Sequence, residues 1–528
     1  MPDDTTKRPK SNEAIQDLRE WLSRIEDIDE LVRITDPVNR DEEMSAISYL
    51  LAKLDPSPAA LFENTAGFED SPIGAEMLWN ILGPSIKRIA ITLEEPADTP
   101  TMELIEKVKN KLKTRIPPEE IEAGDAPVFE NTLTGDDIDL DLLPIPKHWP
   151  MDGGRYAGTG DVVITRDPDN GYLNLGTYRM MQQSKNEVGL YLSPGKDARL
   201  HITRCWERGE SVEVAAAWGV DPLFLLVGSQ TFAKNISEYE YIGGIKSQPV
   251  PVVKGKKTNL LLPANAEIVI EGIIKPNAVR SEGPFGEFPG YYGRPEAGCP
   301  LIEVTALHYR TKPILTNALM ADYPSCEQSG FFSIIRSAKI WDDLDKLGIP
   351  GIAGVYAHPA AAGGFGMTVV SLEQRHAGHA AQVLSLAAQV PGGAYYTKWI
   401  IAVDEDVDPT NMDEVIWAMA SRSNPIDDID ILRNTWSTWL DPTQNPPENR
   451  PYGSKVLINA CKDHRHLPVF SKRTTLRKEI YDDVAARWQK LGLPDKAPQV
   501  RAFEEESVSV YHEIGGFEPG LQPGEKKT

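Results

Sequence analysis

The middle of the chain is a series of short apolar runs separated by turn residues, and this pattern constrains the fold most. The runs are rich in β-branched and aliphatic residues, and they are Asp161–Thr165, Leu223–Val227, Leu260–Leu262, Ala266–Ile273 and Leu301–Tyr309. Short strands of this kind, divided by turns, are typical of a β-barrel or a sandwich. We therefore expect a central β-domain over residues 126–320.

A mixed pattern of helices and strands precedes this β-rich segment. Asn12–Ile25 carries apolar residues at helical spacing, and Asp98-Thr99-Pro100 is a start signal for a second helix. Leu31–Ile34 and Ile89–Ile91 have the composition of strands. The mixture predicts a first α/β domain.

The last third of the chain also alternates. The expected strands are Ile352–Ala357, Met367–Val370 and Trp399–Val403, and the expected helices are 374–389, 411–422 and 474–491. The last helix has one apolar stripe, formed by Leu476, Ile480, Val484, Trp488 and Leu491. We predict an α/β multidomain protein with an N-terminal α/β domain (1–125), a linker-like stretch (114–128), the central β-domain, a C-terminal α/β domain ending in a helix (321–500) and a tail (501–528).

Composition narrows the possible partners. The net charge of −23 disfavours phosphate backbones and anionic lipid, so we expect neither nucleic-acid nor membrane binding, and any basic pocket must be local. No apolar run approaches the roughly 18–20 residues that span a bilayer, and the acidic start Met1-Pro2-Asp3-Asp4 is unlike a signal peptide. The four cysteines are widely spaced, which is typical of a reducing cytoplasm.

A loop with two glutamates is the strongest candidate for chemistry. Glu282 and Glu287 bracket Gly-Pro-Phe-Gly, and Pro284 and Gly286 make the segment a shaped loop rather than a helix face. Two carboxylates in one desolvated pocket raise one pKa, which gives a proton donor near neutral pH. The alternative is a surface turn with two solvated glutamates.

Residues 171–181 form a second candidate segment. Asn174 and Arg179 have opposite parity, so a plain strand would separate them, whereas a bend near Gly176 would bring them together. A guanidinium matches a substrate carboxylate bidentately. The alternative is an edge strand with a solvated arginine.

The loop resembles the signature of the UbiD-like decarboxylases, the family that includes ferulic acid decarboxylase. That signature, Glu-x-Pro-Phe-Gly-Glu followed by an aromatic, a small residue and Gly-Tyr, corresponds to Glu282–Tyr291, and further similarities extend from about Leu143 to about Ala420. The resemblance implies a catalytic Glu-Arg-Glu triad of Arg179, Glu282 and Glu287. It also implies that the central domain is a split β-barrel that binds a flavin.

The family binds a divalent cation, and the resemblance assigns its ligands to Asn174, His201 and Glu238, with Glu240 as a rival to Glu238. An amide oxygen, an imidazole and a carboxylate suit Mn²⁺ or Mg²⁺. Alone, His201 on an apolar strand would be a core residue and Glu238 a surface charge. In the family the metal holds the phosphate of prenylated FMN, and K⁺ lies nearby.

Further cofactor contacts are implied less directly. Lys398 resembles the family's phosphate-binding lysine, with Lys455 as a rival, and a solvated lysine at a strand start is the alternative. Thr159 and Thr177 are candidates for contacts with the cofactor, as are the metal ligands and Arg179.

The implied activity is reversible non-oxidative decarboxylation of an aromatic, heteroaromatic or α,β-unsaturated acid through a covalent adduct with prenylated FMN. Cleaving a C–CO₂ bond needs an electron sink that side chains do not supply. Arg179 would orient the carboxylate, Glu282 would tune Arg179, and Glu287 would protonate the carbon. Polar residues of the stretch 322–328 are candidates to receive a ring substituent.

The implied partners are an aromatic acid, CO₂ and a flavin prenyltransferase that supplies the cofactor, with assembly into a homodimer or homohexamer. Two other functions stay open at this point. One is a flavin-dependent oxidoreductase, and the other is a non-catalytic cofactor-binding subunit of a multi-subunit carboxylase.

Overall fold

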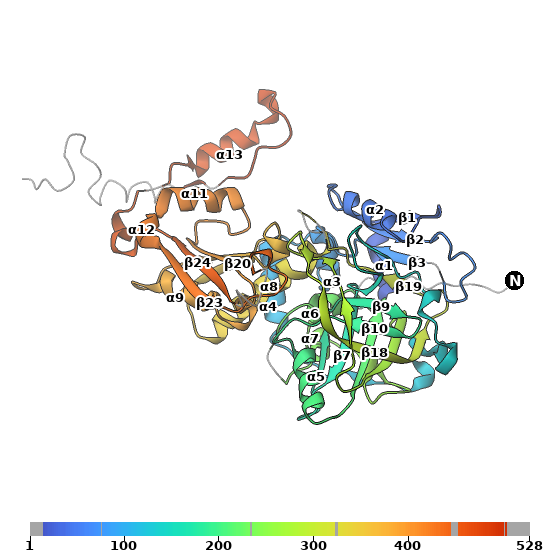
Figure 1. Ribbon diagram of the computed structural model, residues 1–528. Helices are drawn as coiled ribbons and strands as arrows, with labels where there is room; N and C mark the ends of the chain where they lie inside the picture. Colours follow the sequence, from blue (N-terminus) through green and yellow to red (C-terminus); the bar gives the residue numbers. More distant parts are fainter. Residues whose placement is uncertain are drawn as a thin grey trace, which may run out of the picture. The chain divides into compact units, whose positions relative to one another are not determined.

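The structure is a computed structural model that describes residues 14–74, 76–232, 235–320, 322, 326–444, 452–471, 473–500 and 502–503. Its contacts divide the chain into two compact units (Figure 1). The first extends to Ala460, except for His376–Gly378, and contains every candidate site residue. The second comprises His376–Gly378 and the chain from Cys461 onward.

The first unit begins with a small sheet covered by helices. Its elements are α1 (Leu18–Glu26), β1 (Leu31–Ile34), α2 (Glu43–Leu51), β2 (Ala59–Phe62), β3 (Glu76–Trp79), α3 (Ile86–Thr92) and α4 (Thr101–Lys111). The sheet has the order β1-β2-β3-β19, so its last strand, β19 (Ile314–Thr316), comes from far along the chain. Helix α1 forms because Asp17 caps its first turn and its apolar stripe is buried.

One expected strand of this region is wrong. Ile89–Ile91 lies within helix α3, where Ser85 accepts a hydrogen bond from the backbone N–H of Arg88. Arg88, Ile89 and Ala90 are all buried, so no alternation of exposure marks the segment. Three apolar residues in a row do not distinguish a buried helix from a buried strand.

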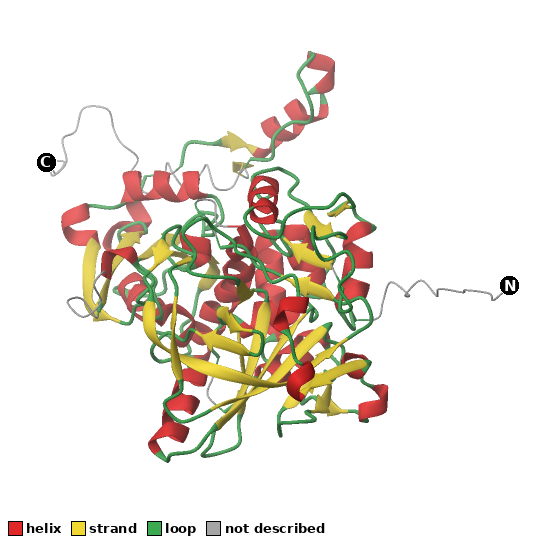
Figure 2. Cartoon of the chain, turned by 45° about the vertical axis from the view of Figure 1, so that its right-hand side comes forward, coloured by secondary structure: helices red, strands yellow, loops and turns green. Residues whose placement is uncertain are grey.

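The central domain is built on a large curled sheet (Figure 2). Its strands are β5 (Asn131–Thr134), β6 (Tyr156–Gly158), β7 (Asp161–Arg166), β8 (Leu173–Gly176), β9 (Met180–Ser184), β10 (Glu187–Leu190), β11 (Val212–Trp218), β14 (Ile268–Ile274), β15 (Val279–Glu282) and β18 (Glu296–Tyr309). The main path runs β6-β9-β10-β18-β14-β11-β7-β8, and β15 and β5 also pair with β18. Strands β6 and β8 lie at the two ends of this path and do not pair with each other. The curled sheet therefore stays open and forms a half-barrel.

Helices and small sheets complete the central domain. They are α5 (Asp197–Glu207), α6 (Leu223–Gly228), α7 (Glu238–Lys246), β4 (Glu119–Glu120), β12 (Pro251–Lys254), β13 (Leu261–Pro263), β16 (Phe285–Gly286) and β17 (Tyr292–Gly293). The expected strand Leu223–Val227 is wrong, because it forms α6. Asp221 accepts a hydrogen bond from the backbone N–H of Leu223, and the short helix is buried on all sides, which hides its period.

A second α/β layer follows in the same unit. It contains α8 (Cys326–Lys346), β20 (Ile352–Ala357), β21 (Met367–Leu372), α9 (His379–Ala387), α10 (Pro391–Ala394), β22 (Trp399–Asp404), α11 (Met412–Arg422), α12 (Pro425–Asp428), β23 (Ile429–Thr435) and β24 (Gly453–Ala460). The sheet order is β20-β21-β22-β24-β23. The three expected strands and the helix at 411–422 are confirmed, whereas the helix expected at 374–389 begins only at His379.

The second unit contains β25 (Leu476–Arg477), α13 (Lys478–Ala486) and β26 (Ala502–Phe503). The helix expected at 474–491 is shorter than predicted, and none of the residues of α13 is buried. The expected tail lies outside the described residues apart from Ala502 and Phe503.

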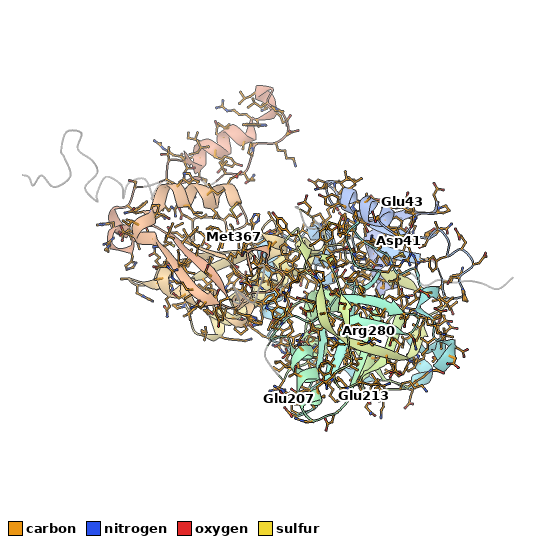
Figure 3. All side chains as sticks on the ribbon, viewed as in Figure 1. Asp41, Glu43, Glu207, Glu213, Arg280 and Met367 are labelled. Carbon is orange, nitrogen blue, oxygen red and sulfur yellow. The ribbon has the colours of Figure 1, made fainter. Side chains whose placement is uncertain are left out.

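Short 3-10 turns occur at 123–125, 127–129, 135–137, 140–142, 362–364, 442–444, 464–469 and 489–491. Among the described helices, none has the length and apolar character needed to span a membrane. Acidic side chains such as Glu43 and Glu207 lie on the outside of the first unit (Figure 3).

Candidate active site

A buried arginine joins the two glutamates of the loop. Nη1 of Arg179 lies 2.6 Å from Oε1 of Glu287, and Nη2 lies 2.7 Å from Oε2 of Glu282. The side chains of Arg179 and Glu282 are 2% and 0% exposed, and that of Glu287 is 9% exposed. The three residues predicted from distant segments therefore converge on one point.

The backbone explains this convergence. Glu282 ends β15, Glu287 follows β16, and Arg179 precedes β9. The bend expected near Gly176 lies where β8 ends, and a Cβ on Gly176 would come within 2.5 Å of the Tyr178 ring. Arg179 is thus directed away from β8, toward the glutamate loop.

Asp152 holds the glutamate loop in place. Its carboxylate accepts hydrogen bonds from the backbone N–H groups of Trp149 (2.8 Å) and Gly286 (3.0 Å). Phe285 packs on the Tyr156 ring, with centroids 4.1 Å apart. Burial raises the pKa of Asp152 to about 6.

The two glutamates have different surroundings. Glu282 also accepts a hydrogen bond from the Tyr156 hydroxyl at 2.8 Å. Burial raises the pKa of Glu287, and the charge of Arg179 only partly opposes this effect. Burial acts to lower the pKa of Arg179, but Glu282 and Glu287 outweigh it, so this pKa is raised. The raised pKa of Glu287 suits a proton donor that works near neutral pH.

A cavity of about 120 Å³ opens beside Arg179 and Glu287. Its polar lining includes Thr159, Thr177, Ser193, Lys196 and Ser229. Its apolar wall is formed by Met320, Phe332, Phe365, Tyr395, Phe288 and Leu440. The cavity therefore offers an aromatic surface next to an arginine and a buried acid.

A smaller cavity of about 40 Å³ adjoins the first and shares Thr177, Tyr178, Lys196 and Ser229 with it. Asn174 lines this niche and is 4% exposed, and its Nδ2 has no hydrogen-bond partner. Because rotation about the last side-chain bond exchanges the positions of the amide O and N atoms, the side chain can turn its oxygen toward a bound ion. The niche therefore suits a metal-bound phosphate.

The other two expected metal ligands contact the paired strands β7 and β8. Thr165, the β7 partner of Asn174, contacts Nδ1 of His201 at 3.0 Å. Glu238 is buried, and it accepts a hydrogen bond from the backbone N–H of Leu175 at 2.8 Å. The expectation that His201 lies on a strand is wrong, because His201 belongs to helix α5. His201 and Ile202 are both on the buried side of this helix, and a short apolar stretch of this kind resembles a strand in the sequence.

The described residues contain no cluster of three or more His, Cys, Asp or Glu side chains placed to hold a metal ion. The expected set includes only two such residues beside the amide of Asn174. The rival Glu240 is half-buried, whereas Glu238 is 3% exposed. An amide, an imidazole and a carboxylate are a mixed O/N donor set, and of these three residues only Asn174 is among the described residues that line the niche.

The candidate lysines differ in their surroundings. Nζ of Lys398 pairs with Asp441 at 2.9 Å, and Lys398 is not among the residues lining the two cavities. Lys455 is buried and donates to the carbonyls of Ala388, Gly393 and Ala394, which is a structural role. Thr159 lines the cavity beside Arg179, and its hydroxyl donates to the carbonyl of Ala318.

Sequence reasoning missed three residues of the site. Tyr156 bonds Glu282, Tyr191 lies under the Arg179 guanidinium at 3.9 Å from its ring centroid, and Lys196 lines both cavities. Tyr156 ends a Pro- and Gly-rich stretch that the sequence does mark as irregular. No local signal marks the other two.

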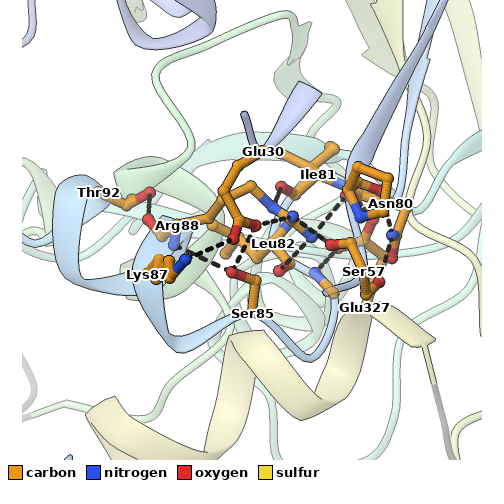
Figure 4. Close-up of polar contacts among 12 residues, drawn as sticks. Glu30, Ser57, Asn80, Ile81, Leu82, Ser85, Lys87, Arg88, Thr92 and Glu327 are labelled. Atoms are coloured by element: carbon orange, nitrogen blue, oxygen red, sulfur yellow. Dashed lines mark hydrogen bonds and ion pairs between the residues drawn. The ribbon is translucent and has the colours of Figure 1, made fainter. Parts of the chain in front are cut away.

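The described residues of the polar stretch 322–328 lie in two different environments. Glu327 is buried, and its carboxylate accepts hydrogen bonds from the backbone N–H groups of Ile81, Leu82 and Gly83 (Figure 4). Its carboxylate is therefore engaged in holding this turn. Tyr323–Ser325 lie outside the described residues.

Asp322 lies in a different place. It lines a further cavity of about 280 Å³, on which Glu287 and Met320 also border, together with Tyr49 and Trp149. The hydroxyl of Tyr49 donates to Oδ2 of Asp322 at 3.3 Å. Glu287 thus borders two cavities, one beside Arg179 and one beside Asp322.

Comparison with known proteins gives consistent matches along the first unit. Profiles of the N-terminal, Rift-related and C-terminal domains of 3-octaprenyl-4-hydroxybenzoate carboxy-lyase match residues 22–108, 119–323 and 329–460. A phenolic acid decarboxylase from Escherichia coli O157:H7 is 33% identical, over 84% of this chain and 96% of its own length. The chain belongs to the UbiD family of carboxy-lyases.

Solved structures agree with this assignment. Vanillic acid decarboxylase from Sedimentibacter hydroxybenzoicus, in its closed form, superposes with a TM-score of 0.82 at 28% identity, covering 90% of this chain and 100% of that one. Its open form gives a TM-score of 0.77. The UbiD-class enzyme HmfF from Pelotomaculum thermopropionicum, in an evolved dimeric form with prFMN, gives 0.74 at 26% identity, covering 88% and 97%.

Proposed function

We propose that this carboxy-lyase is a reversible, non-oxidative decarboxylase of a phenolic or other aromatic acid that uses prenylated FMN. The observation that carries the proposal is the Arg179 guanidinium, which bridges two buried glutamates at the edge of an aromatic-lined cavity. The names of its relatives, a phenolic acid decarboxylase and a vanillic acid decarboxylase, support this substrate class.

The residues present fit the cofactor. The ring system would occupy the cavity beside Arg179, and the phosphate would occupy the niche lined by Asn174, with His201 and Glu238 as further metal ligands. Mn²⁺ or Mg²⁺, with K⁺ nearby, suits these donors. When bound, prenylated FMN would supply the electron sink for the carbon that loses CO₂. A flavin prenyltransferase would supply the cofactor.

Arg179 would hold the substrate carboxylate. Its fork can bind a carboxylate bidentately, and the surrounding low dielectric strengthens that contact. Glu282 and Tyr156 fix the orientation of the guanidinium, because Tyr156 donates to Oε1 of Glu282 while Arg179 binds Oε2. Arg179, Glu282 and Tyr156 therefore position the carboxylate that leaves as CO₂.

Glu287 would move the proton. Its raised pKa keeps it protonated to higher pH than a solvated glutamate, so it can donate to the carbon that has lost CO₂. In the direction of carboxylation, the same carboxylate would remove that proton. The second cavity at Glu287 would connect the acid to the solvent from which it regains a proton.

The test is to co-express the chain with a flavin prenyltransferase, to identify the bound cofactor by mass and absorbance, and to screen aromatic and cinnamic acids for CO₂ release. We expect prenylated FMN, a bound divalent metal, and CO₂ from phenolic acids. The native mass should correspond to a homodimer or homohexamer. Reduction by NADH without CO₂ release would favour an oxidoreductase, and activity only after addition of other subunits would favour a carboxylase subunit.

A further inference from the structure

A second cavity at Glu287, the outer cavity, leads from this buried acid to exposed residues. It has a volume of about 280 Å³, and its lining includes Glu287, Met320, Tyr291 and Asp322, of which the last two are exposed. A water molecule needs about 10–15 Å³ of such space, so the outer cavity has room for several. The outer cavity therefore offers Glu287 a path for protons that is separate from the cavity beside Arg179.

The two cavities at Glu287 differ in the charges of their walls. The cavity beside Arg179 has this guanidinium and the ammonium of Lys196 in its lining. Among the described residues that line the outer cavity, the charged side chains are the acids Glu287 and Asp322. An acidic wall attracts protons and protonated buffer, and it repels a substrate carboxylate. The carboxylate and the proton therefore reach Glu287 from different sides.

The two carboxylate oxygens of Glu287 differ in the same way. Oε1 lies 2.6 Å from Nη1 of Arg179, which is a short, charge-assisted contact. Oε2 instead accepts a long hydrogen bond of 3.4 Å from the backbone N–H of Phe288. Because the weaker contact leaves Oε2 more capacity to accept a further hydrogen, Oε2 is the oxygen suited to carry and exchange the proton.

Helix α2 orients Asp322 at the outer cavity. The hydroxyl of Tyr49 donates to Oδ2 of Asp322 at 3.3 Å, and the Tyr49 ring packs edge-on against Trp149 with centroids 5.9 Å apart. Lys53 lies over the other ring contact of Tyr49 at 4.2 Å, but it is exposed, so solvent screens its charge. Asp322 is therefore tied to Trp149, whose indole also donates to the carbonyl of Met320.

We propose that Asp322 is a positioning residue for proton transfer, which returns a proton to Glu287 through the outer cavity after each turnover. Glu287 gives its proton to the carbon that has lost CO₂ and becomes a carboxylate. Asp322 then passes a proton through water to Oε2 of Glu287 and takes another from the solvent, so every CO₂ released consumes a solvent proton. The inference rests on the proposed function, and Asp322 acts only through Glu287.

The experiment separates the first turnover from the later ones. Protein loaded with prenylated FMN is mixed rapidly with an excess of a phenolic acid, and product per active site is followed with time. Asp322→Asn keeps the size of the side chain and an acceptor for Tyr49, but it has no acidic proton. Asp136→Asn, at an exposed position of the 3-10 turn 135–137, is the matched control. Absorbance and thermal unfolding verify cofactor content and folding.

We expect Asp322→Asn to complete its first turnover at the wild-type rate, because that turnover uses the proton already on Glu287. Later turnovers wait for a new proton and should be slower by about tenfold or more, which gives a burst of product. Asp136→Asn should behave as the wild type does. Later turnovers of Asp322→Asn at the wild-type rate overturn the inference. An equal loss in first and later turnovers also overturns it, because a misplaced Glu287 would produce that result.

A small proton donor supplies a second measurement. Imidazolium is a cation, so the acidic outer cavity should admit it, and it can deliver a proton in place of Asp322. At constant pH and ionic strength, added imidazole should raise the later turnovers of Asp322→Asn toward the wild-type rate and leave the wild type unchanged. A slow phase that imidazole does not change overturns the inference.

The inference and the proposed function fail in different ways. A wild type that is fully loaded with prenylated FMN and releases no CO₂ from any aromatic acid overturns both. If the wild type releases CO₂ and Asp322→Asn turns over without a burst at the same rate, the decarboxylase stands and only the proton path through Asp322 fails.

Discussion

At the scale of single residues, the site depends on two glutamates that share one arginine but differ in their other neighbours. Glu282 accepts from both Arg179 and Tyr156, whereas Glu287 borders two cavities and is held at its carboxylate chiefly by Arg179. Burial raises the pKa of Glu287. The same side-chain type therefore has two roles, one in orientation and one in proton transfer.

Replacing Glu287 by Gln should reduce kcat by about 10²- to 10⁴-fold. The amide keeps the shape of the side chain but is not acidic enough to donate a proton near neutral pH. Bound prenylated FMN, measured by absorbance, should stay at the wild-type level. Glu303→Gln, at a partly exposed position on β18, is the matched control and should leave kcat unchanged. A Glu287→Gln enzyme with full activity would exclude this residue as the donor.

The pH dependence of decarboxylation should carry the same signature. Because the pKa of Glu287 is raised, the protonated donor persists above the range of an ordinary glutamate, and kcat falls as pH rises through that raised pKa. Glu287→Gln should remove this decrease from its residual rate. A wild-type rate that instead increases steadily with pH would assign the donor role to another group.

The sequence could predict these residues only where chemistry and local pattern coincide. Glu282 and Glu287 share one loop, and Arg179 lies in a segment that must bend, so all three could be named in advance. Tyr156 and Lys196 reach the site through the folding of distant segments, β6 and the start of α5, and nothing adjacent to them in the sequence marks a site.

At the scale of elements, the glutamate loop is held by close backbone contacts. Asp152 accepts hydrogen bonds from the backbone N–H groups of Gly286 and Trp149, and a Cβ on Gly286 would come within 2.3 Å of the Trp149 ring. The indole of Trp149 in turn donates to the carbonyl of Met320 at 2.7 Å. The loop therefore has little freedom to move Glu287 away from Arg179.

Gly286→Ala should lower kcat/KM by at least tenfold, because the added methyl must displace the Trp149 ring or the loop that carries Glu287. Gly298→Ala on β18 is the matched control, since a Cβ there meets no atom within 4 Å. We expect this control to have wild-type kinetics and stability. Equal activity of the two variants would show that the loop tolerates displacement.

Helices and strands were predictable where one face is exposed, because apolar and polar residues then alternate in the sequence with the period of the element. Strands β1, β20 and β22 have the expected positions, as does helix α11. Leu223–Val227 and Ile89–Ile91 were wrongly predicted as strands. Both lie in helices that are buried on most sides, so their apolar runs show no helical period in the sequence. The half-barrel itself depends on pairing between distant strands, such as β18 with β5, which composition does not encode.

At the scale of the whole first unit, a buried polar network joins the N-terminal sheet to α8 (Figure 4). Arg88 is 0% exposed, and it binds Glu30 at 2.7 Å and the carbonyls of Ile81 and Leu82 at 2.8 and 2.9 Å. Glu327 binds the same turn from α8. This network fixes the start of α8, which carries Phe332 to the wall of the cavity beside Arg179.

Arg88→Met should lower the free energy of unfolding by about 3–5 kcal/mol, because it leaves Glu30 buried without its partner. Lys87→Met is the matched control. Its ammonium is exposed and lies 3.8 Å from the same glutamate, so the change should be within about 0.5 kcal/mol. Denaturant unfolding followed by circular dichroism measures both, and equal stabilities would remove the network from the account.

The most direct test of the central claim follows the proton that replaces CO₂. Protein loaded with prenylated FMN is incubated with a phenolic acid in D₂O, and mass spectrometry and NMR locate deuterium in the product. We predict one deuterium at the carbon that carried the carboxylate, and a rate of product formation reduced by about 10²- to 10⁴-fold in Glu287→Gln with the cofactor still bound. Product formed by that variant at the wild-type rate, or no CO₂ from the fully loaded wild type, would contradict the account.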